Sequence, residues 1–188
     1  MLVRGFKSKC ENISEEVRKN LGLGNTDPLL PNNLAKYLGV SLINPSEIEN
    51  LSKQSLIQLL QTDKYSWSAV TISYLGIDLI IYNSSHTQAR YSSDIMHELS
   101  HIILGHKPSQ IVILSTDSQI ALRDYNKDAE EEATWLAGCL LLPREALLFI
   151  RRTRMSNGSA CDKYCVSNDL LTFRVNKTGI NYQFSISR

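Results

Sequence analysis

Apolar residues in the first third of the chain recur at the three- and four-residue spacing of amphipathic helices. Ile13, Val17 and Leu21 follow this spacing, which predicts a helix that ends before Gly22. The next predicted helix starts at Pro31 and stops at Gly39, because proline is favoured at the first helical position and glycine just after the last. The helices predicted here span about residues 10–21, 31–38 and 47–62.

A different pattern, rich in β-branched and aromatic residues, marks the middle of the chain. Residues 68–74 and 77–82 have this composition, and Leu75-Gly76 lies between them, which is typical of a hairpin. Further strand candidates are residues 40–43, residues 111–114 and the alternating tail 182–186. The sequence therefore predicts an α+β fold in which a small sheet packs beside helices.

The sequence predicts two largely apolar helices in the second half of the chain. N-cap candidates at residues 92–94 and stop signals at Gly105 and Pro108 bound a helix that is apolar over most of its circumference. Such a helix is buried. A second helix over residues 128–142 is stopped by Pro143. Downstream we expect a helix to about residue 154, a turn at 157–158 and another short helix.

The buried helix carries the most informative motif of the chain, His97-Glu98-Leu99-Ser100-His101. Residues four apart share a helix face, so His97 and His101 can bind one metal ion through neutral ring nitrogens. Glu98 lies one step further round the helix, where a carboxylate can take a proton from a metal-activated water. The alternatives are a surface helix that happens to carry two histidines and a neutral buried histidine pair. Burial of all three polar side chains favours the metal.

A catalytic zinc site needs a third ligand, and no histidine follows His106. The acidic start of the 128–142 helix offers candidates. Glu130 continues the buried stripe of that helix by one turn, whereas Glu132 lies nearer its flank. We therefore expect Glu130 to point inward, with Glu132 in reserve; the other acids are explained by favourable charge at a helix N-terminus.

These residues carry a family resemblance. The run H-E-L-S-H-I-I-L-G-H, followed by E-E-E-A-T-W-L-A-G-C-L-L-L-P, resembles the ImmA/IrrE family of zinc metallo-endopeptidases. The resemblance implies a zincin-like fold, with H-E-x-x-H on a central helix and the third ligand, Glu130, on a following helix. It also implies one zinc ion per chain and a helix-turn-helix repressor as the protein substrate. Thr134 stands where the family has asparagine, and Leu136 where it has phenylalanine.

Residues beyond the ligands are weaker candidates. Thr134 lies one turn after Glu130, so its hydroxyl could orient a ligand histidine by a hydrogen bond. His106, Arg90 and Tyr91 are candidates for stabilising the oxyanion, although His106 also fits a core or helix-terminal histidine. Arg90 and Tyr91 equally fit packing or surface roles.

Composition agrees with one domain. The 188 residues, 43% hydrophobic with formal net charge +1, can build one core. We divide this domain into an N-terminal helical part (1–66), the sheet with the metal-binding helices (67–143) and a C-terminal helical part (144–188).

No stretch of about 18 apolar residues and no signal peptide is evident, which predicts a cytoplasmic protein without a membrane contact. Near-neutral charge argues against direct nucleic-acid binding, and the four cysteines are expected to be free thiols.

Three functional hypotheses remain open from the sequence. The first is a zinc endopeptidase that cleaves a helix-turn-helix repressor by metal-activated water attack. The second is a non-proteolytic regulatory module that binds the repressor while keeping the metal site. The third, a DNA-binding regulator, is suggested weakly by the helical region 166–180. We also expect one strand of the 68–82 hairpin to be an exposed edge that pairs with an extended substrate.

Overall fold

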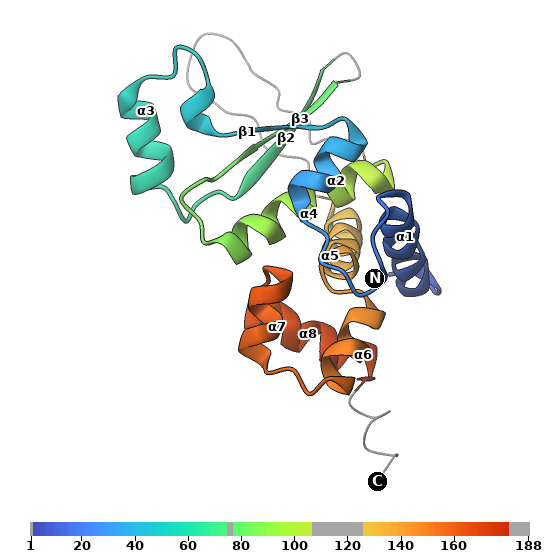
Figure 1. Cartoon of the computed structure of the whole chain (residues 1–188). Helices are drawn as coiled ribbons and strands as arrows, with labels where there is room; N and C mark the ends of the chain where they lie inside the picture. The colour runs from blue at the N-terminus through green and yellow to red at the C-terminus, as the bar shows by residue number, and fades with distance from the viewer. Residues whose placement is uncertain (1, 75–76, 107–125, 181–188) are drawn as a thin grey trace.

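The computed structural model describes residues 2–74, 77–106 and 126–180 (Figure 1). The strands expected at 111–114 and 182–186 lie outside these residues. In the described part, the helices are α1 (Phe6–Asn20), α2 (Pro31–Leu38), α3 (Lys53–Ile57), α4 (Gln88–Leu104), α5 (Lys127–Leu141), α6 (Arg144–Arg152), α7 (Asn157–Tyr164) and α8 (Asn168–Thr178). A 3₁₀ turn spans Pro45–Glu47, and a π-helical segment spans Gln58–Thr62. The strands are β1 (Ser41–Ile43), β2 (Ala69–Tyr74) and β3 (Ile77–Tyr82).

The sheet has the strand order β1-β3-β2 among the described residues. β2 and β3 pair antiparallel, which confirms the predicted hairpin, and β1 pairs parallel with β3. β3 is therefore central and β2 lies at an edge. One face of the sheet, which includes the buried Ile80, packs against α4. The mixed α+β architecture expected from the sequence is confirmed.

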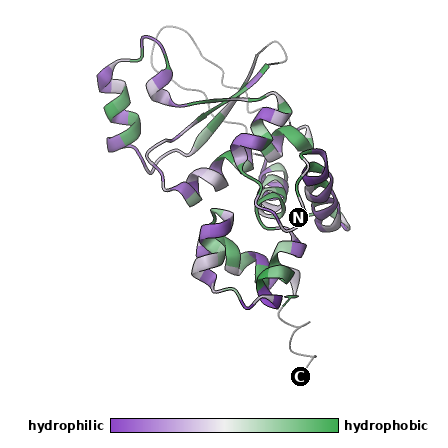
Figure 2. Cartoon of the chain, viewed as in Figure 1, coloured by the Kyte–Doolittle hydropathy of each residue, from purple (hydrophilic) through white to green (hydrophobic). Residues whose placement is uncertain are grey.

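Helix α4 lies between the sheet and α5 (Figure 1). Its Ile95, Met96 and Leu99 are fully buried, and so are Leu136 and Leu140 of α5. Figure 2 shows the contrast with α1, which is mostly hydrophilic and covers α5 from outside. The motif-bearing helix is thus fixed by apolar contacts on two sides, because burial of each such side chain contributes about 1.5–3 kcal/mol.

The last carbonyl groups of α5 are bound by side chains from distant parts of the sequence. A helix end leaves such carbonyls without an intrahelical partner. Three side chains donate to them: Ser14 to Cys139 (2.8 Å), Arg18 to Leu140 (2.6 Å) and Arg174 to Leu142 (2.9 Å). These hydrogen bonds hold α1 and α8 against α5. Burial lowers the pKa of Arg18 to about 10.

Four boundary predictions were wrong. α1 begins at Phe6 rather than at about residue 10. α4 begins at Gln88 with Thr87 as N-cap rather than at residues 92–94, because its first turns are polar and gave no apolar signal. The helix expected over 47–62 is broken into short segments, with a left-handed residue at Asn50. The turn expected at 157–158 is the start of α7, since the hydroxyl of Ser156 caps that helix.

Within the described residues, no single helix is long and apolar enough to cross a bilayer. α5 and α6 meet the length and composition criteria only as a pair that is bent by 43°. Much of that apolar surface belongs to the protein core, because residues such as Leu140, Leu141 and Leu147 are almost completely buried.

Candidate metal centre

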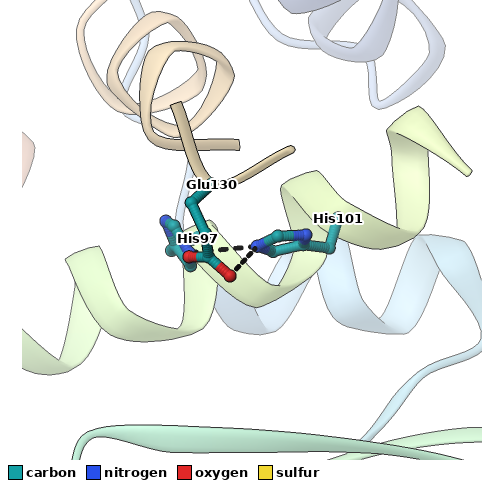
Figure 3. Close-up of side chains that lie close together, drawn as sticks. All are labelled: His97, His101 and Glu130. Atoms are coloured by element: carbon teal, nitrogen blue, oxygen red, sulfur yellow. Dashed lines mark hydrogen bonds and ion pairs between the residues drawn. The ribbon is translucent and has the colours of Figure 1, made fainter. Parts of the chain in front are cut away.

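His97 and His101 project from the same face of α4, one turn apart (Figure 3). Their Nε2 atoms are 3.1 Å from each other, and the ring centroids are 4.8 Å apart at an interplanar angle of 70°. The helix end is fixed by Gly105, whose φ of 67° lies in the left-handed region that favours glycine. The predicted stop of this helix is confirmed.

Glu130 reaches the two histidines from the first turns of α5 (Figure 3). The side chain of Asn126 caps α5 by accepting from the N–H groups of Asp128 and Ala129, at 3.1 and 3.2 Å. The Oε2 atom of Glu130 is 3.1 Å from His97 Nε2, and its Oε1 atom is 3.7 Å from His101 Nε2. Three potential ligand atoms, one from each side chain, therefore converge.

The geometry of this His97–His101–Glu130 triad fits a small metal ion. A tetrahedral ion with bonds of about 2.0–2.1 Å holds neighbouring ligand atoms about 3.3 Å apart. The two Nε2 atoms are 3.1 Å apart, close to that value, and a carboxylate oxygen of Glu130 lies near each of them: Oε2 is 3.1 Å from His97 and Oε1 is 3.7 Å from His101. The side chains are 17–25% exposed, so the centre is reachable yet mostly enclosed. Two imidazoles and one carboxylate could hold a metal ion at this point.

The carboxylate of Glu98 is anchored to the sheet. Glu98 is 6% exposed, and its Oε2 accepts a hydrogen bond from the hydroxyl of Thr71 in the edge strand β2. An anchored carboxylate keeps one orientation without paying further ordering entropy. Sequence reasoning missed Thr71, because a threonine in a strand carries no signal for contact with a helix 27 residues later.

The Nδ1 atoms of the two triad histidines face away from the ligand atoms, toward further partners. Thr134 Oγ1 is 3.5 Å from His97 Nδ1, and His106 Nδ1 is 3.0 Å from His101 Nδ1. His106 in turn has its Nε2 3.1 Å from Glu132. The three further side chains that the sequence singled out, Thr134, His106 and Glu132, therefore lie outside the triad, with Thr134 beside His97 and the other two beside His101.

Arg90 and Tyr91 bond to residues outside the triad. The guanidinium of Arg90 lies near Asp94 and donates to the hydroxyl of Ser68 at 3.4 Å. The Tyr91 hydroxyl donates to Asn32 at 2.7 Å. Burial raises the pKa of Tyr91, with a smaller contribution from Tyr82, while the hydrogen bond to Asn32 lowers it. These contacts tie the start of α4 to the residue before β2 and to α2.

Two imidazoles and one carboxylate beside a buried glutamate are side-chain types that zinc hydrolases use as ligands and general base, and here they lie together in an α+β fold. The family model for the IrrE N-terminal-like domain, a peptidase family, matches residues 51–175. The chain belongs to this family, which confirms the resemblance seen in the sequence.

Comparison with solved structures supports the fold. A Mycobacterium tuberculosis transcriptional regulator is similar with a TM-score of 0.53 and 15% identity. The match covers 92% of this chain and 47% of the regulator, so the chain spans about half the length of that protein. No curated protein sequence matches the chain significantly.

Proposed function

We propose that the chain is a zinc-dependent endopeptidase that cleaves a helix-turn-helix transcriptional repressor in the cytoplasm. The observation that carries this proposal is the convergence of the three triad ligand atoms beside a buried, anchored Glu98. Membership in a peptidase family supports hydrolysis as the reaction. A transcriptional regulator among the similar structures is consistent with a partner in gene regulation.

Zinc is the metal that the donor set favours. Two imidazoles with one carboxylate are a ligand set of catalytic zinc, which keeps its fourth position open. The proposed ligands are His97 Nε2, His101 Nε2 and one carboxylate oxygen of Glu130, giving one ion per chain. Harder cations such as magnesium and calcium prefer all-oxygen sites.

Each residue has a proposed role in hydrolysis. Zinc, when bound, supplies a Lewis acid that lowers the pKa of a coordinated water toward about 7 and polarises the scissile carbonyl. Glu98 accepts the proton of the attacking water and delivers it to the leaving amine. Thr71 keeps the Glu98 carboxylate in one orientation, because the Thr71 hydroxyl donates a hydrogen bond to one of the two carboxylate oxygens.

The edge strand β2 is the proposed platform for the substrate. The N–H of Asn83 donates to the carbonyl of Ser68, and ladder bonds in an antiparallel pair involve alternate residues. Residues 69, 71 and 73 therefore direct their N–H groups away from β3. An extended peptide that bonds to them lies beside Thr71 and hence beside Glu98. Main-chain pairing has little sequence preference, so selectivity is assigned to docking of the whole repressor.

The test uses the purified chain with candidate helix-turn-helix repressors, and cleavage is followed by intact mass spectrometry. We expect a discrete pair of fragments, loss of cleavage with a zinc chelator, and recovery when zinc is added back. A repressor that binds the zinc-loaded chain but is never cut would overturn the peptidase proposal. That outcome would establish instead the non-proteolytic binding module, in which the metal site is structural.

A further inference from the structure

His106 and Glu132 extend the row of polar groups on the side of His101 that faces away from the triad. The His101 and His106 rings meet edge to face, with centroids 5.0 Å apart at 69°. Their Nδ1 atoms are 3.0 Å apart, and His106 Nε2 is 3.1 Å from Glu132 Oε2. Both ring nitrogens of His106 are therefore engaged, one by each neighbour.

The positions of the protons along this row follow from the triad. A neutral imidazole carries one N–H, and a nitrogen that binds a metal presents its lone pair. If Nε2 of His101 is the ligand atom, its Nδ1 carries the hydrogen and donates to Nδ1 of His106. The hydrogen of His106 is then on Nε2, where it donates to the carboxylate of Glu132. Every donor meets an acceptor in this single arrangement.

The backbone at the end of α4 places His106 next to His101. The N–H of Gly105 donates to the carbonyl of Ile102 at 3.1 Å, and the N–H of His106 donates to the carbonyl of His101 at 3.0 Å. This pair of bonds around a left-handed glycine is a Schellman motif. The motif brings the residue after the glycine back against the residue five positions earlier, a place where hydrophobic contacts are common. Here a histidine fills it.

The two triad histidines are therefore supported unequally. His97 Nδ1 has Thr134 Oγ1 at 3.5 Å, the long limit of a hydrogen bond, whereas His101 has a 3.0 Å partner that is itself bonded to a carboxylate. His106 is 13% exposed in its side chain and Glu132 is 27% exposed, so solvent competes only partly for these bonds.

We propose that His106 and Glu132 are a positioning pair that fixes His101 in the tautomer whose Nε2 binds the metal, and that makes this nitrogen a stronger donor. The proposal rests on the proposed metal site and deepens it. Such outer partners orient the ligand ring and contribute about 10- to 100-fold to metal affinity. The sequence left Glu132 as a reserve ligand. In this proposal it does not bind the metal but holds His106, which in turn contacts the ligand His101.

The test is a chelator competition that measures zinc affinity for His106→Ala, Glu132→Gln and the double variant. Glu131→Gln is the matched control, because Glu131 is the exposed neighbour of Glu132 on the same helix. We expect each single variant to bind zinc about 10- to 100-fold more weakly and the control to be unchanged. Because the two residues act in series, the double variant should be no weaker than His106→Ala alone.

Two further readings separate the possible failures. The midpoint temperature of thermal unfolding should be the same for the metal-free variants and the metal-free wild type. A purely structural role of these residues would lower that temperature in the variants. If both single variants retain wild-type zinc affinity while Glu130→Ala loses it, the positioning pair is wrong and the metal site stands. If the wild type itself binds no zinc, the proposed function fails first. Additive losses in the double variant would also overturn the serial arrangement.

Discussion

Thr71, in the edge strand of the sheet, donates a hydrogen bond to the carboxylate of Glu98 on α4. This contact joins the element proposed to hold the substrate to the group proposed to move the proton. A peptide that pairs with β2 would therefore meet the base at a fixed distance along the strand. The hairpin and α4 are adjacent in the sequence. In the proposed mechanism the hairpin binds the substrate and α4 carries the general base.

Thr71→Val is expected to reduce turnover about 10- to 100-fold, because it removes a hydrogen bond to a charged group worth about 1.5–3 kcal/mol. The valine is close in shape to threonine, so the strand and the zinc content should be preserved. Thr71→Ser keeps the donor and is the control. The measurement is kcat on a cleaved repressor; equal kcat for the valine variant and the wild type would remove Thr71 from this role.

Ser73→Pro is expected to slow cleavage without changing zinc content. Residue 73 directs its N–H away from β3, so proline removes a donor that the sheet does not use. Ser73→Ala is the control, since it also removes the hydroxyl contact with Asp78 but keeps the N–H. The readout is kcat/KM with the metal content measured in the same sample. Unchanged kcat/KM would show that another element presents the substrate.

Glu130→Ala is expected to lose nearly all of the one equivalent of zinc that the wild type binds, since it removes one of three ligands. Glu131→Ala, at the exposed neighbouring position, should keep that equivalent. Elemental analysis of the purified proteins makes the comparison. The assignment is wrong if Glu132→Ala strips the metal while Glu130→Ala retains it.

Arg174→Met is expected to destabilise the fold by about 3 kcal/mol. Arg174 is fully buried, donates to the carbonyl of Leu142 and pairs with Glu11 at 2.5 Å. Its loss leaves the carboxylate and the helix-end carbonyl without that partner. Lys177→Met, which removes an exposed charge from the same helix, should cost less than about 0.5 kcal/mol. Chemical denaturation gives both free energies of unfolding, and equal values would contradict the role of Arg174 in holding α8 against the end of α5.

Three tyrosines are expected to lose their contribution to stability as the pH rises above about 10, whereas Arg18, whose pKa is lowered by burial, contributes in the opposite direction. Burial is the main cause that raises the pKa of Tyr82, Tyr91 and Tyr164 above the ordinary value of 10.0. A folded-state pKa above the unfolded one gives stability that is present at lower pH and lost as the pH rises through the folded value. Denaturation midpoints of the wild type and of Tyr164→Phe, compared across this range, isolate the contribution of one tyrosine. Tyr164→Phe should flatten the loss, and a steeper loss would contradict the account.

The sequence was most informative where chemistry and periodicity coincide. The four-residue spacing of His97 and His101 requires only that the segment be helical, and the buried stripe of α5 pointed to Glu130 because the same face carries the apolar core. The hairpin and the helix stop at Gly105 were predicted for similar local reasons. Each depends on residues close together in the chain.

Features that depend on tertiary packing were not predictable in the same way. Thr71 meets Glu98 only after the sheet has packed on α4, and the polar start of α4 has no apolar period to mark it. The side chains that bind the end of α5 come from α1 and α8, more than 30 residues away. No local pattern encodes which arginine becomes buried, so Arg18 and Arg174 were not singled out.

The most direct test of the central claim is a comparison of wild type and Glu98→Gln at equal, measured zinc content. The amide is nearly isosteric with the carboxylate, and it still accepts the Thr71 hydrogen bond through its carbonyl oxygen. It cannot take a proton from water. Fragments of the repressor are counted by mass spectrometry after the same incubation. If Glu98 is the general base, the variant binds one zinc ion and produces no fragments; cleavage at the wild-type rate by a zinc-loaded Glu98→Gln would remove Glu98 from that role.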